Sequence, residues 1–185
     1  IVTNYSVNGT DLGNLFQITL TNSIIDTFSS YSNNYVASDL TGTNLVSIFP
    51  NSSNNTTLVK YSTNGGTTWT TGSTLANIVA TCIASSSTGQ NLIIGGNSSN
   101  TTNPIYISSN YGASWTFISL TASDNVTITG VAISSNGLIM HACANMLSAN
   151  TEGYWSISSG GGIANSVFFG TINNFKSICC SGDGL

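Results

Sequence analysis

The chain has 185 residues, enough for one domain with a hydrophobic core, and it combines 40% hydrophobic with only 4% charged residues and a formal net charge of -4. Lys60 and Lys176 are its only lysine or arginine side chains. These are too few for the phosphate contacts of nucleic-acid binding or for attraction to an anionic membrane. No apolar run approaches the roughly 18 residues of a membrane-spanning helix. We therefore expect no nucleic-acid partner and no membrane insertion.

Serine, threonine and asparagine replace the missing charges, at 30, 25 and 24 positions respectively. Disordered chains combine high charge with few aromatic residues, whereas this chain is 9% aromatic and rich in β-branched residues. These features indicate a folded protein with a polar, nearly uncharged surface.

In chain order, the first recurring element is a hairpin pattern that returns every 47 or 48 residues. Each copy has an apolar run followed by a Ser/Gly turn and a second apolar run, as a β-hairpin does. The copies are "VASDLTGTNLV" (36–46), "IASSSTGQNLI" (83–93), "VAISSNGLIM" (131–140) and "ICCSGDGL" (178–185). The fourth copy stops after its turn, and joining Leu185 to Ile1 recreates its second strand. We therefore expect either a closed ring or one unit of a longer tandem array.

A second motif, Ser-x-Asn-x-Gly-x-x-Trp, lies between the hairpins with an apolar strand pattern on each side. It occurs as "STNGGTTW" (62–69) and "SSNYGASW" (108–115), and in a weaker form as "SISSGGG" (156–162). Four strands in about 40–50 residues are typical of a β-propeller blade. We predict an all-β, single-domain β-propeller, or a segment of one, with about four repeats of four antiparallel strands. The repeats start at 36, 83, 131 and 178, and residues 1–35 complete the last one.

The second motif resembles the Asp-box, or BNR repeat, of sialidase-like, sortilin-like and photosystem-assembly-factor-like propellers, with Asn in place of Asp. The resemblance implies a turn between the outer strands of a blade, remote from the active face. An Asn side chain can bond backbone N–H groups nearby, Gly supplies a positive φ, and a Trp ring buries a large area between blades. We interpret the motif as a fold-building turn. Its residues are Ser62, Asn64, Gly66, Trp69, Ser108, Asn110, Gly112 and Trp115.

The same resemblance raises sialidase activity, which the sequence argues against. Sialidases grip a substrate carboxylate with an arginine cluster, and this chain has no arginine. Other glycosidases need two facing carboxylates. The acidic residues are Asp11, Asp26, Asp39, Asp124, Glu152 and Asp183. Asp39 and Asp183 fall in hairpin turns, which we expect on one rim, and we interpret them as turn-forming residues rather than catalytic ones.

His141 is the single histidine and lies in an apolar run between Met140 and Cys143. One histidine with dispersed thiols does not make a metal site. We expect a packed core histidine, with no metal and no cofactor.

The four cysteines, Cys82, Cys143, Cys179 and Cys180, show no CxxC spacing. Adjacent residues of a strand point to opposite faces, so Cys179 and Cys180 should have different surroundings. We predict one disulfide, between Cys143 and either Cys179 or Cys180. Buried free thiols are the alternative.

Asn-x-Ser/Thr sequences, the acceptors of N-linked glycans, are frequent. They begin at Asn4, Asn8, Asn51, Asn54, Asn55, Asn97, Asn100 and Asn125. "NSSNNTT" (51–57) and "NSSNTTN" (97–103) fall at corresponding points of the repeat, in predicted loops. We therefore expect a glycosylated protein that is secreted or lies on a cell or virion surface.

Two functional classes fit these features, and an enzyme ranks third. The first is a non-enzymatic building unit of a fibre, filament or coat that self-associates or repeats in tandem, favoured by low charge and repetition. Strands without charged gatekeepers do not resist edge-to-edge pairing. The second is a propeller adhesin that binds glycans or proteins through its loops. A fibre unit predicts contacts between repeats, an adhesin a discrete pocket, and a glycoside hydrolase a close carboxylate pair.

Overall fold

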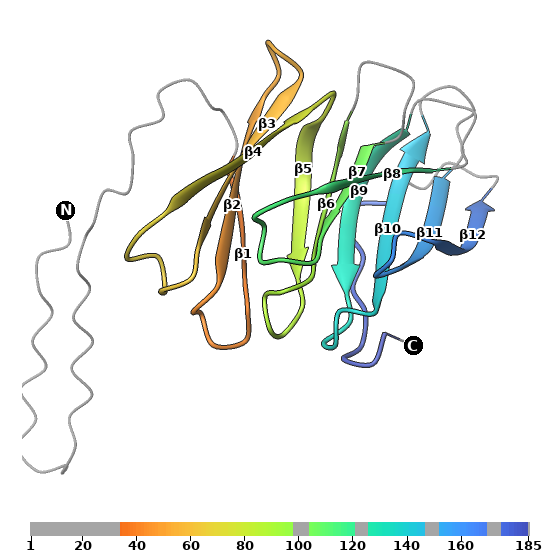
Figure 1. Cartoon of the computed structure of the whole chain (residues 1–185). Coiled ribbons are helices and arrows are strands. Elements are labelled where there is room, and N and C mark those ends of the chain that lie inside the picture. Colours follow the sequence, from red (N-terminus) through yellow and green to blue (C-terminus); the bar gives the residue numbers. More distant parts are fainter. Residues whose placement is uncertain (1–33, 98–103, 121–125, 147–151, 170–174, 185) are drawn as a thin grey trace, which may run out of the picture.

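The computed structural model describes residues 34–97, 104–120, 126–146, 152–169 and 175–184 (Figure 1). These residues form twelve β-strands and contain no helix, which confirms the predicted all-β class. Accordingly, the described part has no helix long and apolar enough to cross a membrane.

The strands form three four-stranded sheets, the blades. The first blade contains β1 (Tyr35–Ser38), β2 (Leu45–Asn51), β3 (Thr56–Ser62) and β4 (Thr70–Ala76). The second contains β5 (Val79–Ser85), β6 (Leu92–Asn97), β7 (Pro104–Ser108) and β8 (Thr116–Ser119). The third contains β9 (Val126–Ile133), β10 (Ile139–Met146), β11 (Glu152–Ser158) and β12 (Ile163–Phe169).

Within each blade, neighbouring strands are antiparallel and follow chain order, so each blade is a simple meander. The blades follow one another side by side, and the second separates the first from the third (Figure 1). This is the arrangement that the predicted four-strand repeat requires. Three blades are described. Residues 1–35 were expected to complete the fourth repeat, and 1–33 of them lie outside the described residues.

Alternating side chains create the packing between blades. In β2, Val46, Ile48 and Pro50 are buried while the residues between them are partly exposed, and β9 alternates in the same way. A period of two places alternate residues on one face of a sheet. Each blade therefore presents an apolar face to its neighbour.

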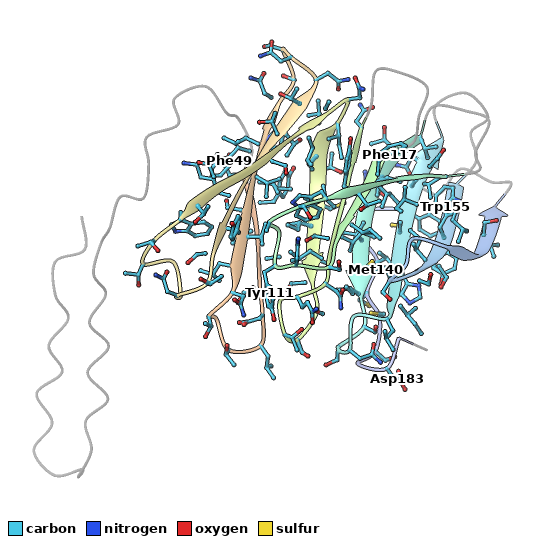
Figure 2. All side chains as sticks on the ribbon, in the orientation of Figure 1. Phe49, Tyr111, Phe117, Met140, Trp155 and Asp183 are labelled. Carbon is cyan, nitrogen blue, oxygen red and sulfur yellow. The ribbon has the colours of Figure 1, made fainter. Side chains whose placement is uncertain are left out.

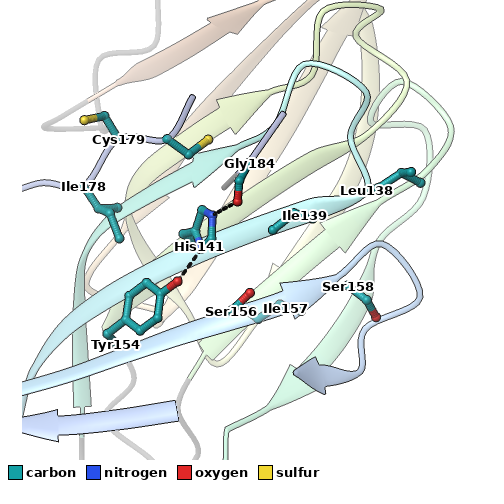
Figure 3. A pocket seen from close by; sticks show the side chains of 11 residues that line it. Leu138, Ile139, His141, Tyr154, Ser156, Ile157, Ser158, Ile178, Cys179 and Gly184 are labelled. Atoms are coloured by element: carbon teal, nitrogen blue, oxygen red, sulfur yellow. Dashed lines mark hydrogen bonds between the residues drawn. The ribbon is translucent and has the colours of Figure 1, made fainter. Parts of the chain in front are cut away.

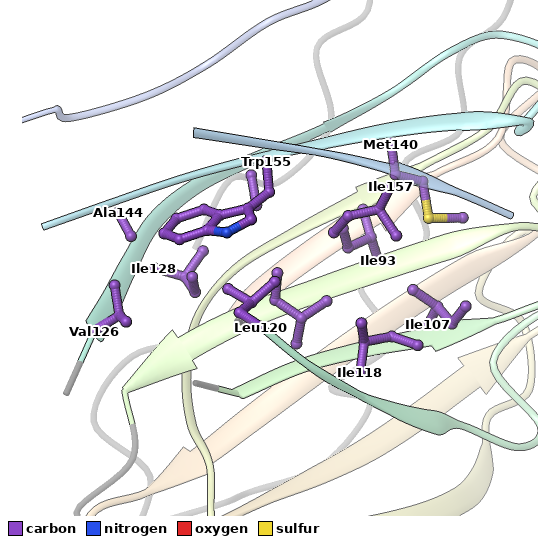
Figure 4. Close-up of a cluster of buried hydrophobic side chains, with 12 residues drawn as sticks. Ile93, Ile107, Ile118, Leu120, Val126, Ile128, Met140, Ala144, Trp155 and Ile157 are labelled. Atoms are coloured by element: carbon purple, nitrogen blue, oxygen red, sulfur yellow. The ribbon is translucent and has the colours of Figure 1, made fainter. Parts of the chain in front are cut away.

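Two core clusters fill the spaces between the blades. The first cluster joins the first and second blades and consists of Val46, Ile48, Val59, Leu75, Ile78, Ala80, Leu92 and Ile94. The second cluster joins the second and third blades around the Trp155 ring, which is fully buried (Figure 4). Its other members are Ile93, Ile105, Ile107, Ile118, Leu120, Val126, Ile128, Met140, Ala142, Ala144 and Ile157.

The hairpin turns between the two inner strands of each blade lie along one edge of the molecule (Figure 1). We call this edge the turn rim and define it as residues 39–43, 86–90, 134–138 and 181–184. Each turn has a glycine at the same position with a positive φ, which glycine adopts without strain. These are Gly42 (74°), Gly89 (76°), Gly137 (74°) and Gly184 (82°).

The turns bond to one another through a ladder of backbone hydrogen bonds. The donors and acceptors are Leu40 N to Ser87 O (2.9 Å), Ser87 N to Ser135 O (3.0 Å) and Ser135 N to Gly182 O (2.8 Å). Each step crosses from one repeat to the next. The fourth turn, in segment 175–184, is therefore stacked on the third blade as the third blade is stacked on the second.

Candidate functional site: the turn rim and the outer flank of the third blade

The first Ser-x-Asn-x-Gly-x-x-Trp turn connects β3 to β4 and is closed by its own side chains. The Ser62 hydroxyl accepts the N–H of Gly66 (2.9 Å) and donates to Asn64 Oδ1 (2.9 Å). Asn64 Oδ1 also accepts the N–H of Thr68 (2.9 Å). Trp69 Nε1 donates to the Gly66 carbonyl (3.0 Å), and Gly66 has a φ of 83°. These polar groups therefore form hydrogen bonds with one another inside the turn.

The second copy connects β7 to β8 and repeats these bonds closely. The Ser108 hydroxyl accepts the N–H of Gly112 and donates to Asn110 Oδ1, both at 3.0 Å. Asn110 Oδ1 accepts the N–H of Ser114 (2.9 Å). Trp115 Nε1 donates to the Gly112 carbonyl (3.0 Å), and the φ of Gly112 is 86°.

The third, weaker copy is a shorter turn between β11 and β12, without the asparagine or tryptophan. The Ser158 hydroxyl still accepts the N–H of Gly162 (3.2 Å), and the Ser158 N–H donates to the Gly162 carbonyl (2.8 Å). In each blade this outer turn also bonds to the turn rim. The pairs are Gly65 N to Thr43 O (2.9 Å), Tyr111 N to Gln90 O (3.1 Å) and Ser159 N to Leu138 O (3.0 Å).

Both box tryptophans differ from the expectation of rings buried between blades, because Trp69 and Trp115 are half-buried. The indole N–H bond to a carbonyl of the same turn holds each ring over that turn. A Cβ atom on Gly66 would lie 3.6 Å from Trp69 Nε1. Trp115 additionally packs against the first core cluster.

Asp39 begins the first turn of the rim, and its carboxylate is surrounded by donors from the same turn. It accepts the N–H groups of Thr41 (3.1 Å), Thr43 (2.9 Å) and Asn44 (3.1 Å). The Asn44 side-chain amide adds a bond of 2.7 Å. Burial raises the pKa of Asp39, but the bonds from Asn44, Thr41 and Thr43 outweigh it, so the pKa is lower than usual. Asp39 is thus a turn-forming carboxylate.

Asp183 lies in the fourth turn of the rim, where Ser181 donates to its carboxylate. Two further turns stand between Asp183 and Asp39 in the ladder. Asp39 and Ser181 line a hollow of about 300 Å³ between the inner strands, and Asp183 is outside that lining. Glycosidase chemistry needs two carboxylates across one bond, and these two acids do not form such a pair.

The outer flank of the third blade, facing away from the second blade, carries a larger pocket of about 540 Å³ (Figure 3). His141 is its most buried polar side chain, 8% exposed. The Tyr154 hydroxyl lies 2.8 Å from His141 Nδ1, and the Gly184 carbonyl lies 3.3 Å from Nε2. An Nε2–H tautomer satisfies both contacts, with the tyrosine donating to Nδ1 and Nε2–H donating to the carbonyl. His141 therefore connects β11 to the fourth turn.

His141 holds a position that is apolar in the other two blades. It pairs with an alanine of the inner strand, as do Val46 in the first blade and Ile93 in the second. Met140 and Ala142 on either side belong to the second core cluster, so His141 faces outward. Sequence reasoning expected a packed core histidine but had no signal for this cross-repeat contact, because Tyr154 and Gly184 lie far from it in the chain.

The predicted disulfide is not formed, since all four cysteines are free thiols. Cys143 is buried, and the backbone of segment 175–184 passes beside it. A Cβ atom on Gly130 would lie 3.2 Å from Cys143 Sγ and 2.9 Å from the Cα of Ser177. Cys179 lies farther along this segment and is exposed. The segment thus covers Cys143 with residues other than cysteine.

Cys82, on β5, is a partly buried thiol that packs against the second core cluster. Burial raises its pKa to about 11. It is therefore protonated at neutral pH and packs as a small apolar side chain.

The described N-glycosylation candidates lie at the ends of strands opposite the turn rim. Asn51 ends β2, Asn54 and Asn55 lie in the connection from β2 to β3, and Asn97 ends β6. Asn54 and Asn97 are exposed, while Asn51 and Asn55 are partly buried. Asn4, Asn8, Asn100 and Asn125 lie outside the described residues. We call this edge the loop face.

Comparisons with known proteins bear on the fold. No family model and no curated protein matches the chain. Among solved structures it is similar to the Dos1 propeller, with 16% identity and a TM-score of 0.55. It is also similar to the β-propeller domain of the Trilobed protease from Pyrococcus furiosus, with 12% identity and a TM-score of 0.53. A third similar structure is the GH74 xyloglucanase from Xanthomonas campestris, with 10% identity and a TM-score of 0.52.

These matches cover 81%, 77% and 72% of this chain, but only 40%, 45% and 21% of the matched chains. The chain therefore has a β-propeller fold and spans less than half the length of these similar structures.

Proposed function

We propose that the chain is a non-enzymatic structural unit of an extracellular fibre, filament or surface coat, built from divergent Asp-box propeller blades. The turn rim carries the proposal. Its backbone groups bond from turn to turn across repeats, and the outer turns bond back to the same rim. This face serves to stack blades, which is the task of a building unit.

The loop face supports the same role. Asn54 and Asn97 are exposed there, away from the bonded rim, so glycans at these positions would leave blade stacking undisturbed. A chain with only 4% charged residues needs another source of solubility, and glycans supply it.

We infer a non-enzymatic role from the state of the described acids. The Asp39 carboxylate already accepts hydrogen bonds of 2.7–3.1 Å from Thr41, Thr43 and Asn44 within its own turn. The similar GH74 enzyme is a xyloglucanase, and incubation of this chain with xyloglucan provides the control assay. We expect no release of reducing sugar, and release above a heat-inactivated sample would contradict the inference.

The main test is analysis of the native protein. Peptide mapping by mass spectrometry should find glycans at Asn54 and Asn97, and electron microscopy of the native material should show the chain in polymers. Expression of Asn54→Gln and Asn97→Gln variants in a glycosylating host should lower the mass by one glycan each. Unmodified asparagines together with dispersed single particles in the native source would sink the proposal.

A further inference from the structure

We propose that Asn64, in the first Ser-x-Asn-x-Gly-x-x-Trp turn, is a site of spontaneous deamidation, which converts its side-chain amide to a carboxylate. The product has the sequence Ser-x-Asp-x-Gly-x-x-Trp of the Asp-box that this turn resembles. The reaction needs water and a backbone nitrogen in the next residue that can reach the side-chain carbon. It is independent of the proposed self-association of the chain.

The residue after Asn64 supplies an unhindered nucleophile. Gly65 is exposed and has a φ of 67°. Its nitrogen attacks the side-chain carbon of Asn64, and glycine has no Cβ that would crowd this approach. The Gly65 N–H donates to the Thr43 carbonyl (2.9 Å), so this bond has to open first. Because Gly65 lies at the surface, breaking the bond requires only a local opening of the turn.

The side-chain carbonyl of Asn64 is polarised by the turn itself. Its Oδ1 accepts the Ser62 hydroxyl and the Thr68 N–H, both at 2.9 Å. When a nitrogen adds to Cγ, negative charge develops on Oδ1, and donors already aimed at that oxygen stabilise the charge. The two bonds that close the turn therefore also favour the addition step.

The reaction balances without an oxidant or a reductant. Hydroxide removes the proton of the Gly65 nitrogen, which then bonds to Asn64 Cγ. The bond from Cγ to Nδ2 breaks, the amide nitrogen takes a proton from water, and ammonia leaves a five-membered succinimide ring. Water opens this ring between Cγ and the Gly65 nitrogen to give aspartate, or at the backbone carbonyl to give isoaspartate. One water is consumed and one ammonia is released.

An aspartate at position 64 preserves the hydrogen bonds of the turn. The oxygen that corresponds to Oδ1 keeps the Ser62 hydroxyl and the Thr68 N–H as donors. Asn64 Nδ2 donates to Thr68 Oγ1 (2.8 Å), and a carboxylate oxygen in its place accepts from the same hydroxyl, which is free to rotate. Isoaspartate instead lengthens the backbone of the turn. The turn therefore accommodates the aspartate product.

The second copy of the motif is a matched control within the chain. Asn110 Oδ1 accepts the Ser108 hydroxyl (3.0 Å) and the Ser114 N–H (2.9 Å). The nitrogen of the next residue again donates to a carbonyl of the turn rim, from Tyr111 to Gln90 (3.1 Å). The difference is the tyrosine side chain, which crowds the attacking nitrogen. We therefore expect Asn110 to keep its amide.

A second Asn-Gly pair of the described residues lies in the turn rim. Asn136 is followed by Gly137, which is buried and whose N–H donates to the Ser134 carbonyl (2.9 Å) inside the same turn. A Cβ on Gly137 would lie 2.4 Å from Asn91 Nδ2 of the second blade. The packing between blades thus restrains this nitrogen, and we expect slower deamidation than at Asn64. A third pair, Asn8–Gly9, lies outside the described residues.

Peptide mapping by mass spectrometry tests the proposal on the full folded chain. The protein is incubated in mildly alkaline buffer and sampled over days, and the carboxylate fraction is measured at each asparagine. We expect the fraction to rise fastest at Asn64, more slowly at Asn136 and not at Asn110. Tyr111→Gly is the gain-of-reaction variant, because Tyr111 has a φ of 61° that glycine adopts without strain. It should raise the rate at Asn110 to that at Asn64.

The fit of the product is measured separately. Asn64→Asp should unfold at the same urea concentration as the parent chain, and Asn64→Ala should unfold at a lower one. An amide at position 64 that persists in the folded chain would overturn the proposal, and its loss in urea alone would show that the turn protects it. Equal rates at Asn64 and Asn110 would overturn the role of Gly65. Early unfolding of Asn64→Asp would overturn the retention of the turn.

Discussion

The two faces of the third blade differ in how they contact their neighbours. The face toward the second blade is closed and apolar, filled by Trp155, Met140 and their neighbours. The opposite face, one residue along each strand, carries His141, which bonds to Tyr154 and to the Gly184 carbonyl of the fourth turn. Apolar packing tolerates many partners, whereas a directed hydrogen bond demands one geometry. The apolar face therefore maintains the packing between blades, and the polar face holds the fourth turn through the bond from His141 to Gly184.

The largest effect is expected at the closed face. Trp155→Ala removes a fully buried ring from the second core cluster and should lower the free energy of unfolding by about 3–5 kcal/mol. Phe117→Ala is the matched control, because this aromatic ring of the second blade is 41% exposed (Figure 2). Chemical denaturation measures both. Equal losses in the two variants would contradict the assignment of the core.

A second prediction compares two turns of the rim. Gly42 and Gly89 have the same left-handed φ, but a Cβ on Gly89 would lie 2.7 Å from Asn44 Cβ, and one on Gly42 meets nothing within 4 Å. Gly42→Ala should cost about 1–2 kcal/mol from backbone strain alone. Gly89→Ala should cost about 1–3 kcal/mol more, because it also overpacks the contact between blades. Thermal denaturation of the pair provides the check, and equal costs would refute stacking of the turns.

The third prediction concerns the polar flank. His141→Val installs the side chain that the first blade has at this position, but it leaves the Gly184 carbonyl and the Tyr154 hydroxyl without their donor or acceptor. We expect a loss of about 1–3 kcal/mol and increased proteolysis of segment 175–184. Ile93→Val, at the corresponding position of the second blade, is the control for reduced volume. This control should leave proteolytic cleavage of segment 175–184 unchanged. If cleavage is also unchanged in His141→Val, the histidine does not hold the segment in place.

A smaller effect is expected at the outer turns. Ser62→Ala removes the acceptor of the Gly66 N–H and the donor to Asn64, and should cost about 0.5–1.5 kcal/mol. Ser158→Ala, in the shorter third turn, loses a longer bond of 3.2 Å and should cost less. Urea denaturation of the two variants gives the difference. A larger loss at Ser158 would show that the full motif adds nothing to the turn.

The smallest effect is the pH dependence from Asp39. The hydrogen bonds from Asn44, Thr41 and Thr43 outweigh burial and hold the pKa of Asp39 in the folded protein below the usual value of an aspartate. Its stabilising contribution is therefore fully present above the unfolded pKa and is lost as pH falls through the folded pKa. Asp39→Asn should slightly reduce the loss of unfolding free energy at acid pH, measured by chemical denaturation over a series of pH values. Asp183→Asn is the control. An unchanged loss at acid pH would contradict the assigned carboxylate bonds.

The turns and the strand alternation could be predicted from the sequence alone. The glycines at 42, 89, 137 and 184 predicted the hairpin period, and all four have a positive φ, because a tight turn admits few other residues. The alternation in β2 and β9 is likewise local and visible in the sequence.

The contacts of His141 could not be predicted in this way. They depend on a strand and a turn distant in the chain, and on which face of β10 meets which neighbour. The burial of the box tryptophans was overestimated for the same reason, since the expected packing between blades competes with an indole bond inside the turn.

Electron microscopy of the purified full chain tests the central claim most directly, since it shows whether arcs of blades join. We predict particles that contain at least two copies of the chain. Isolated particles, each with the mass of a single chain, would contradict the proposed self-association.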